Sequence, residues 1–233
     1  MATLFTTNLS TTFSSTSNPN PNPKPSLNPK PSNLHFLKPL ATSLAATSLL
    51  LSIPSLSLSS PSFNLYYGTA ASAANYGGYG GNSSKQDAAE YTYEVPSDWK
   101  ERLVSKIEKG TNGTDSEFFN PKKRSERVYL TYLAGFRALA PMDTVLSNLA
   151  LSDVELQDLI SSADTVRAME KKDGDGQVYY EYEIDGAAAH RLISVTCARN
   201  KLYAHFVAAP NTEWQRDKDM LTRIHDSFKT VVT

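Results

Sequence analysis

Residues 201–231 constrain the fold of this chain most, because they join a strand to a helix that must cover a sheet. The segment Lys201–Ala209 has the alternation of a strand, and Pro210 marks the turn after it. Beyond Pro210, apolar side chains recur at helical spacing. That pattern predicts an amphipathic helix whose buried face consists of Trp214, Leu221, Ile224 and Phe228.

The start of this helix carries its own signals. Thr212 and Gln215 have the spacing of a capping box, and Asp217 and Asp219 place negative charge in the early turns, where the helix dipole favours it. A helix with so wide an apolar stripe is not stable alone, so it must lie across a sheet. We expect its buried face to contact the strands that carry Ile193, Val195, Leu202 and Phe206.

The rest of the sheet is predicted from alternating segments between turn signals. Tyr91–Val95 and Arg127–Ala134 are expected strands, the second with apolar residues on both faces, which is typical of an interior strand. Asp173–Gly176 predicts a tight hairpin between two more strands, and a second hairpin is expected at Asn200. The segment Trp99–Gly110 suits either a short helix or a strand.

A second helix is predicted after the interior strand. Ser152 and Glu155 form a capping-box pattern ahead of an apolar helical repeat. Helices packed on an antiparallel meander define an α+β domain, here with an antiparallel sheet of about six strands. Residues 91–233 hold 143 residues without a long linker, which suits one domain with one core.

The N-terminal leader has a composition of its own. The first 86 residues contain no Asp or Glu, and Ser, Thr, Asn and Pro dominate the first 39, whose only charges are Lys24, Lys30 and Lys38. This is typical of an organelle transit peptide, and the absence of Arg before Arg102 favours a plastid over a mitochondrion. A disordered Pro/Asn-rich tail is the alternative on composition alone. The segment that follows favours a chloroplast transit peptide over residues 1–39.

Leu40–Ile53 is an uncharged apolar run of signal-peptide length, shorter than the roughly 20 residues that span a membrane. An export signal behind a transit peptide is the pattern of proteins sent to the thylakoid lumen, and without an Arg-Arg pair it resembles a Sec signal. We assign residues 40–73 to this targeting segment. Ala71-Ser72-Ala73 is the better small-x-small cleavage motif but lies far from the run, whereas Ser57-Leu58-Ser59 is closer and weaker, so the cut is expected between residues 59 and 74.

Processing at either motif leaves a mildly acidic protein. It removes three lysines and no acid, so 20 basic and 24 acidic residues remain, a net charge of −4. Such a protein has no electrostatic basis for binding nucleic acid. Residues 74–90 are rich in Gly, Tyr and Ser and are expected to be a flexible lead-in to the domain at 91–233.

One acidic turn invites a calcium interpretation. Asp173-Gly174-Asp175-Gly176 combines carboxylates with glycine, as hard cations prefer. Val178 and Ile184 occupy the sixth and twelfth positions from Asp173, which excludes an EF-hand and favours a plain turn on a solvated acidic face. A looser surface contact with calcium stays open through Asp173, Asp175, Glu181 and Glu183.

Catalytic motifs are absent from the sequence. Cys197 is the only cysteine, so no intramolecular disulfide can form, and its alternation with Ile193 and Val195 places it on a buried strand face. No nucleophile motif surrounds it, and no Gly-rich phosphate loop occurs. Three scattered histidines also lack the pair spacing of a zinc site: His190, His205 and His225. We therefore expect no enzymatic activity.

The segment Asn120–Arg127 is the one basic cluster on this acidic protein. It could be an ordinary exposed hairpin loop. Its functional interpretation is an electrostatic docking patch for an acidic partner surface. The residues of this predicted patch are Lys122, Lys123, Arg124 and Arg127.

Several segments together resemble the PsbP-domain family of thylakoid lumenal proteins. They are YTYEVPSDWKE at the domain start, QVYYEYEIDG followed by HRLISVTCARNKLYAH, and the helix from Trp214 to Phe228 that ends in DSFKTV. The resemblance covers Tyr91 to the C-terminus. It implies an antiparallel sheet sandwiched by helices and a role that is not enzymatic.

The resemblance also implies a place of action. The founding member is an extrinsic protein of photosystem II that helps the oxygen-evolving complex to retain calcium and chloride, so the implied partners are photosystem II lumenal subunits. The residues themselves predict no cofactor, and Ca²⁺ enters as a cofactor only through this resemblance. The founding member works through an N-terminal extension, whose place is taken here by the Gly/Tyr-rich stretch from Asn75. Other relatives are assembly factors, so the alternative is a photosystem assembly or chaperone-like factor that binds assembly intermediates.

Overall fold

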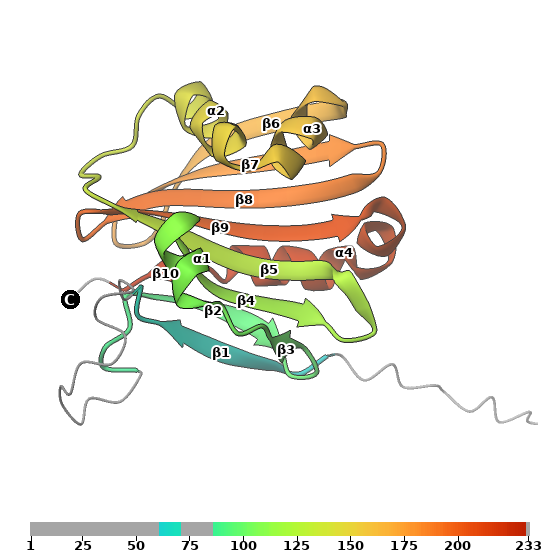
Figure 1. Ribbon diagram of the computed structural model, residues 1–233, viewed down its shortest axis with the longest axis horizontal. Coiled ribbons are helices and arrows are strands. Elements are labelled where there is room, and N and C mark those ends of the chain that lie inside the picture. The colour runs from blue at the N-terminus through green and yellow to red at the C-terminus, as the bar shows by residue number, and fades with distance from the viewer. Residues whose placement is uncertain (1–60, 71–85, 232–233) are drawn as a thin grey trace, which may run out of the picture. The chain divides into compact units, whose positions relative to one another are not determined.

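The computed structural model describes residues 61–70 and 86–231, which form two antiparallel sheets and four helices (Figure 1). The larger sheet has the strand order β3-β4-β5-β9-β8-β7-β6, and the smaller has the order β1-β2-β10. The larger sheet consists of β3 (Lys100–Glu101), β4 (Thr114–Asn120), β5 (Lys123–Ala134), β6 (Ala163–Lys172), β7 (Val178–Gly186), β8 (Ala189–Ala198) and β9 (Lys201–Pro210). The smaller sheet consists of β1 (Phe63–Gly68), β2 (Tyr91–Pro96) and β10 (Lys229–Thr230). The helices are α1 (Lys106–Thr111), α2 (Met142–Ser152), α3 (Val154–Ser161) and α4 (Asn211–Asp226).

This arrangement confirms the predicted α+β fold with an antiparallel sheet between helices, although the larger sheet has seven strands. Both predicted hairpins are present. β6 turns into β7 at Asp173–Gly176, where Gly176 has φ +80°, and β8 turns into β9 through Arg199 and Asn200, with φ +49° and +59°. Left-handed backbone favours Gly and Asn, which explains why these two turns could be recognised.

Helices α2 and α3 cover one face of the larger sheet (Figure 1). Val145 and Leu149 of α2 and Leu156 and Leu159 of α3 are buried there. They belong to a core cluster that also contains the sheet residues Tyr182, Ile184, Ile193, Val195 and Phe206.

Helix α4 and the smaller sheet cover the opposite face. The predicted buried residues are confirmed, because Trp214, Leu221 and Ile224 of α4 are buried, and so is Phe228, which lies just beyond the end of the helix. The predicted partner residues are wrong: Ile193, Val195, Leu202 and Phe206 belong to the cluster under α2 and α3. Successive strand residues point to opposite faces, and both faces of β8 and β9 are apolar, so the alternation did not reveal which face receives which helix. The buried residues of α4 instead share a core cluster with Val128, Leu130, Leu192, Tyr203 and Val207.

Two predicted capping boxes are replaced by other contacts. Helix α4 has Pro210 at its N-cap without a side-chain cap, and Thr212 bonds to Glu213 instead of to the helix backbone. The start of α4 is held by Asn211, whose amide donates to the carbonyls of Gly186 and Ala187. The capping box predicted at Ser152 and Glu155 is also wrong, because Asp153 caps α3. Ser152 is instead the last residue of α2, a helix that the sequence pattern did not predict.

Strand β1 lies inside residues 40–73, the range that the sequence analysis assigns to targeting. It pairs with β2 over six residues, from Phe63 opposite Pro96 to Gly68 opposite Tyr91. The ambiguous segment after β2 contains both the two-residue strand β3 and the short helix α1, which carries a capping box of Ser105 and Glu108. Among the described residues, no helix has the length and apolar character needed to cross a membrane.

Candidate docking site

A pocket of about 330 Å³ opens where the start of β8 and the end of β9 meet the start of β5 and the first turn of α3. Arg124 and Arg127 reach it from β5, and Arg191 reaches it from β8. Glu155 is the only acidic residue among the described residues that line it. The pocket therefore has an excess of positive charge, although the protein as a whole is mildly acidic.

Arg191 is the deepest of these arginines, with 5% of the residue exposed. Its two terminal nitrogens lie 3.1 Å from Asp153 and 3.5 Å from Glu155. Its Nε, however, has no hydrogen-bond partner within the described part of the chain. A buried guanidinium needs acceptors for its donors, so among the described residues Nε of Arg191 is an unsatisfied donor at a position closed to solvent.

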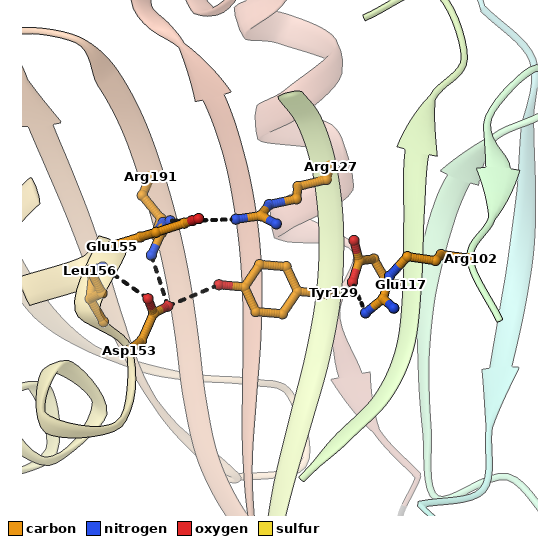
Figure 2. Close-up of polar contacts among 8 residues, drawn as sticks. All are labelled: Arg102, Glu117, Arg127, Tyr129, Asp153, Glu155, Leu156 and Arg191. Atoms are coloured by element: carbon orange, nitrogen blue, oxygen red, sulfur yellow. Dashed lines mark hydrogen bonds and ion pairs between the residues drawn. The ribbon is translucent and has the colours of Figure 1, made fainter. Parts of the chain in front are cut away.

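Asp153 fastens helix α3 to the sheet through both carboxylate oxygens, as Figure 2 shows. Oδ1 accepts from the backbone N–H of Leu156 at 3.0 Å, which is the N-cap contact of α3. Oδ2 accepts from Arg191 and, at 3.4 Å, from the Tyr129 hydroxyl. Burial raises the pKa of Tyr129 to about 12, so this hydroxyl keeps its proton and acts as a donor.

Glu155 bridges Arg127 and Arg191 (Figure 2). Its carboxylate lies 2.6 Å from Arg127 and 3.5 Å from Arg191, yet 70% of its side chain is exposed. Arg127 also lies over the ring of Tyr129, 5.4 Å from the centroid. An exposed ion pair of this kind contributes only about 0–1 kcal/mol, so another carboxylate can replace Glu155 at small cost.

The pocket lining includes His190, whose ring stacks on Trp214 with 3.7 Å between the centroids. The ring nitrogens lie 3.2 Å from Glu183 and 3.3 Å from Asp185. This contact joins β8, β7 and α4 on the face of the sheet opposite to that of Arg191 and α3.

The predicted docking patch is divided by the structure. Arg124 and Arg127 line the pocket, whereas Lys123 faces α4 and pairs with Asp217 at 3.6 Å. Lys122 is exposed in the turn before β5. Arg191 was missed because it occupies an apolar strand 64 residues later in the chain, and a single charge on such a strand gives no motif.

A buried carboxyl group lies behind the predicted patch. Glu126 is fully buried, with Oε2 2.5 Å from the amide of Asn120 and Oε1 3.2 Å from Arg216. Burial and the neighbouring Asp217 carboxylate raise the pKa of Glu126 to about 7. Asp217 is also where α4 departs from helical geometry, with φ −108° and ψ 16°.

The four calcium candidates lie in different surroundings. Asp173 accepts from the backbone N–H groups of Asp175 and Gln177, which is a turn-stabilising contact. Glu181 accepts from Ser194 and lies 2.6 Å from His225. Asp175 takes part in that turn contact through its backbone N–H. Glu183 pairs with Arg167 at 3.0 Å. Across residues 61–70 and 86–231, no cluster of three or more His, Cys, Asp or Glu side chains could hold a metal ion.

Cys197 and His205 both lie in surroundings that disfavour their reactive or charged forms. Cys197 is half-buried near the end of β8, and burial raises the pKa of its thiol, which disfavours the reactive thiolate. His205 is fully buried between the rings of Tyr93 and Phe228, with both centroids at 4.8 Å. Burial and the neighbouring His225 hold the pKa of His205 well below its usual range.

Comparison with known proteins identifies the family. The PsbP family model matches residues 81–230, which is most of the chain. The chain belongs to the PsbP family. It is 66% identical over 195 residues to the thylakoid lumenal 19 kDa protein of Arabidopsis thaliana, a match that covers 82% of this chain and 85% of that protein. This likeness confirms the chloroplast thylakoid lumen as the location of the protein.

Two further comparisons are consistent with the family. PsbP domain-containing protein 4 of Arabidopsis thaliana is 29% identical over 157 residues, which cover 60% of this chain and 56% of that protein. The solution structure of cyanobacterial PsbP from Synechocystis has a TM-score of 0.50 and 20% identity, and the match covers 75% of this chain and 96% of the cyanobacterial one. The likeness to that structure supports the PsbP-like fold.

Proposed function

We propose that this protein is a non-enzymatic extrinsic protein that binds photosystem II subunits from the lumenal side of the thylakoid membrane. Membership of the PsbP family and the lumenal location support the place of action. The docking mode rests on one observation: Arg124, Arg127 and Arg191 converge on a single pocket. Three arginine residues that line one concave site match a carboxylate-bearing segment of a partner protein.

Glu155 supports this docking mode because its carboxylate already binds the arginines in the way proposed for a carboxylate of the partner. Its carboxylate occupies the bridging position between Arg127 and Arg191 while remaining largely in solvent. A partner carboxylate displaces it and completes the bonds of the two arginines. Calcium is left out of this proposal, because Glu181 and Glu183 already have cationic or hydrogen-bonding neighbours.

Retention on thylakoid membranes tests the docking mode. The Arg124→Gln protein should be released at lower salt than wild type, because Arg124 is exposed at the pocket and exposed charges are screened beyond about 10 Å near 0.1 M salt. Arg137→Gln is the matched control, since it removes the same charge from an exposed residue elsewhere. Equal release of both variants would contradict docking through this pocket.

Sedimentation separates the proposed role from an assembly role. Under mild detergent, the protein should migrate with complete photosystem II. Migration with smaller assembly intermediates alone would refute the proposed role and favour a photosystem assembly factor. Arg124→Gln should reduce whichever association is observed, so the two experiments report on role and on docking mode separately.

A further inference from the structure

Strand β1 is bound to the domain mainly through its backbone. It pairs with β2 over six residues, and flanking backbone bonds run from Glu90 to Gly68 and from Ser97 to Ser62. Its side chains are only shallowly buried: Leu65 is 48% exposed, and the one residue of β1 that is fully buried is a glycine. The strand therefore occupies the edge of β2, and it packs against the core through the partly buried side chains of Phe63 and Tyr66.

Three positions of β1 nevertheless make specific contacts. Tyr66 lies 5.3 Å from Tyr93 and 5.0 Å from Phe118 between ring centroids, in a groove of aromatic rings. Phe63 lies under the guanidinium of Arg223, whose Cζ is 3.9 Å from the ring centroid. These two anchors are three residues apart and define an aromatic-x-x-aromatic spacing.

The third position is Gly68, which faces the ring of Tyr91. A Cβ at this position would lie 1.9 Å from the Tyr91 ring, so no other residue fits without displacement of that buried ring. Tyr91 is fixed by its hydroxyl, which donates to Asp115 at 2.7 Å. The segment that pairs with the edge of β2 thus has the pattern aromatic-x-x-aromatic-x-Gly.

The backbone beyond Gly68 is also bound by polar groups of the domain. The N–H of Ala70 donates to the Asp115 carboxylate at 3.2 Å, and the carbonyl of Ala70 accepts from Lys201 at 3.1 Å. Both groups have other partners, because Asp115 pairs with Lys109 and Lys201 pairs with Glu90. Asp115 and Lys201 therefore keep an ion-pair partner when one extended segment is exchanged for another.

The position of β1 in the chain makes it separable from the domain. The family match begins at residue 81, after β1, and the better cleavage motif, Ala71-Ser72-Ala73, lies between the two. Hydrolysis after Ala73 adds water across the peptide bond to Ala74, which gives a new carboxylate and a new amine. This cut would leave β2 paired with β10 at only two residues and unpaired along its other edge.

We propose that the outer edge of β2 is a strand-binding site for a partner protein, which residues 61–70 fill until processing after Ala73 removes them. The ligand is an extended segment with the spacing of Phe63, Tyr66 and Gly68, which pairs antiparallel to β2. Backbone pairing provides affinity, and the aromatic groove and the Tyr91 ring provide specificity. This site goes beyond the basic pocket of the proposed function, because no pocket arginine takes part in it.

The first test uses the protein isolated from the thylakoid lumen. Its N-terminal sequence should begin at Ala74, and its intact mass should agree with that cut. A protein that begins at or before Phe63 would overturn the proposal, because its own β1 would keep the edge filled.

The second test adds a labelled peptide of residues 61–70 to the lumenal protein and measures binding by fluorescence anisotropy. Saturable binding is expected, and Tyr66→Ala or Gly68→Val in the peptide should weaken it more than about tenfold, as for a central anchor of an interface. Leu65→Ala is the matched control, because Leu65 is largely exposed, and it should bind as wild type does. Absence of binding, or equal binding of the Gly68→Val peptide, would overturn the proposal. Neither result involves salt or Arg124, so failure here is distinguishable from failure of the docking pocket.

Discussion

Asp153 and Arg191 lie 38 residues apart in the chain and meet at 3.1 Å, where one carboxylate both caps helix α3 and pairs with a buried arginine. The cap fixes the first turn of α3, and that turn carries Glu155. The position of Glu155 at the pocket therefore depends on Asp153. This relationship connects the stability of the fold to the geometry of the docking pocket.

Substitution of Asp153 should separate these two contributions. Asp153→Ala should lower the free energy of unfolding by about 3 kcal/mol or more, because it removes a cap and leaves Arg191 buried with a weaker partner. Asp153→Asn keeps a capping oxygen but loses the charge, so it should cost about 1 kcal/mol less. Urea denaturation measures both values. If both variants lose the same amount, the cap contributes nothing.

Phe228 should be a large contributor to stability. It is buried after α4 against His205, Tyr179 and Tyr91, with ring centroids at 4.8, 6.0 and 6.5 Å. Phe228→Ala should lower the free energy of unfolding by about 3–5 kcal/mol. Leu103→Ala is the control, since Leu103 is 92% exposed, and it should change stability by less than about 0.5 kcal/mol. A loss under about 1 kcal/mol for Phe228→Ala would contradict this packing.

Glu126 should make stability depend on pH. Its pKa is raised to about 7 in the folded state, so the folded protein binds more protons than the unfolded chain between roughly pH 4.5 and 7. The contribution of this group is fully present below the unfolded pKa and is lost as pH rises through 7. Glu126→Gln keeps the side chain neutral, so it should be more stable than wild type at pH 8 and similar at pH 5.

Denaturation at the two pH values checks this prediction. Glu101→Gln is the control, because it removes the same charge from an exposed strand residue. If Glu126→Gln and Glu101→Gln respond to pH in the same way, Glu126 is ionised in the folded protein throughout this range.

His205 should make the protein less stable as pH falls, which is the opposite of the pH dependence expected from Glu126. Burial and His225 hold its pKa well below the usual value, so the unfolded chain binds the proton first as pH falls below about 6.5. Its contribution to stability is present above that pH and is lost as pH falls. His205→Phe should therefore stabilise the protein more at pH 5 than at pH 8, measured by thermal unfolding. Equal effects at both pH values would mean that His205 does not couple folding to protons.

The sequence by itself determined the elements that carry a local signal. The buried α4 face with Trp214, Leu221 and Ile224 was predictable from its helical spacing, and the hairpin at Asn200 from turn chemistry. The lumenal location followed from the order of two leader segments. In each case the signal lies within a few neighbouring residues, so no knowledge of distant contacts is needed.

Tertiary structure decided whatever depends on residues that are distant in the chain. Leu192 and Ile193 are both apolar, so only the packed structure shows that Leu192 faces α4 and Ile193 faces α2 and α3. Arg191 gives no motif, and it becomes part of the pocket only because antiparallel pairing places the start of β8 beside the end of β9, next to the start of β5. Alternation fixes which residues share a face of a strand, but long-range pairing and helix placement fix what each face meets.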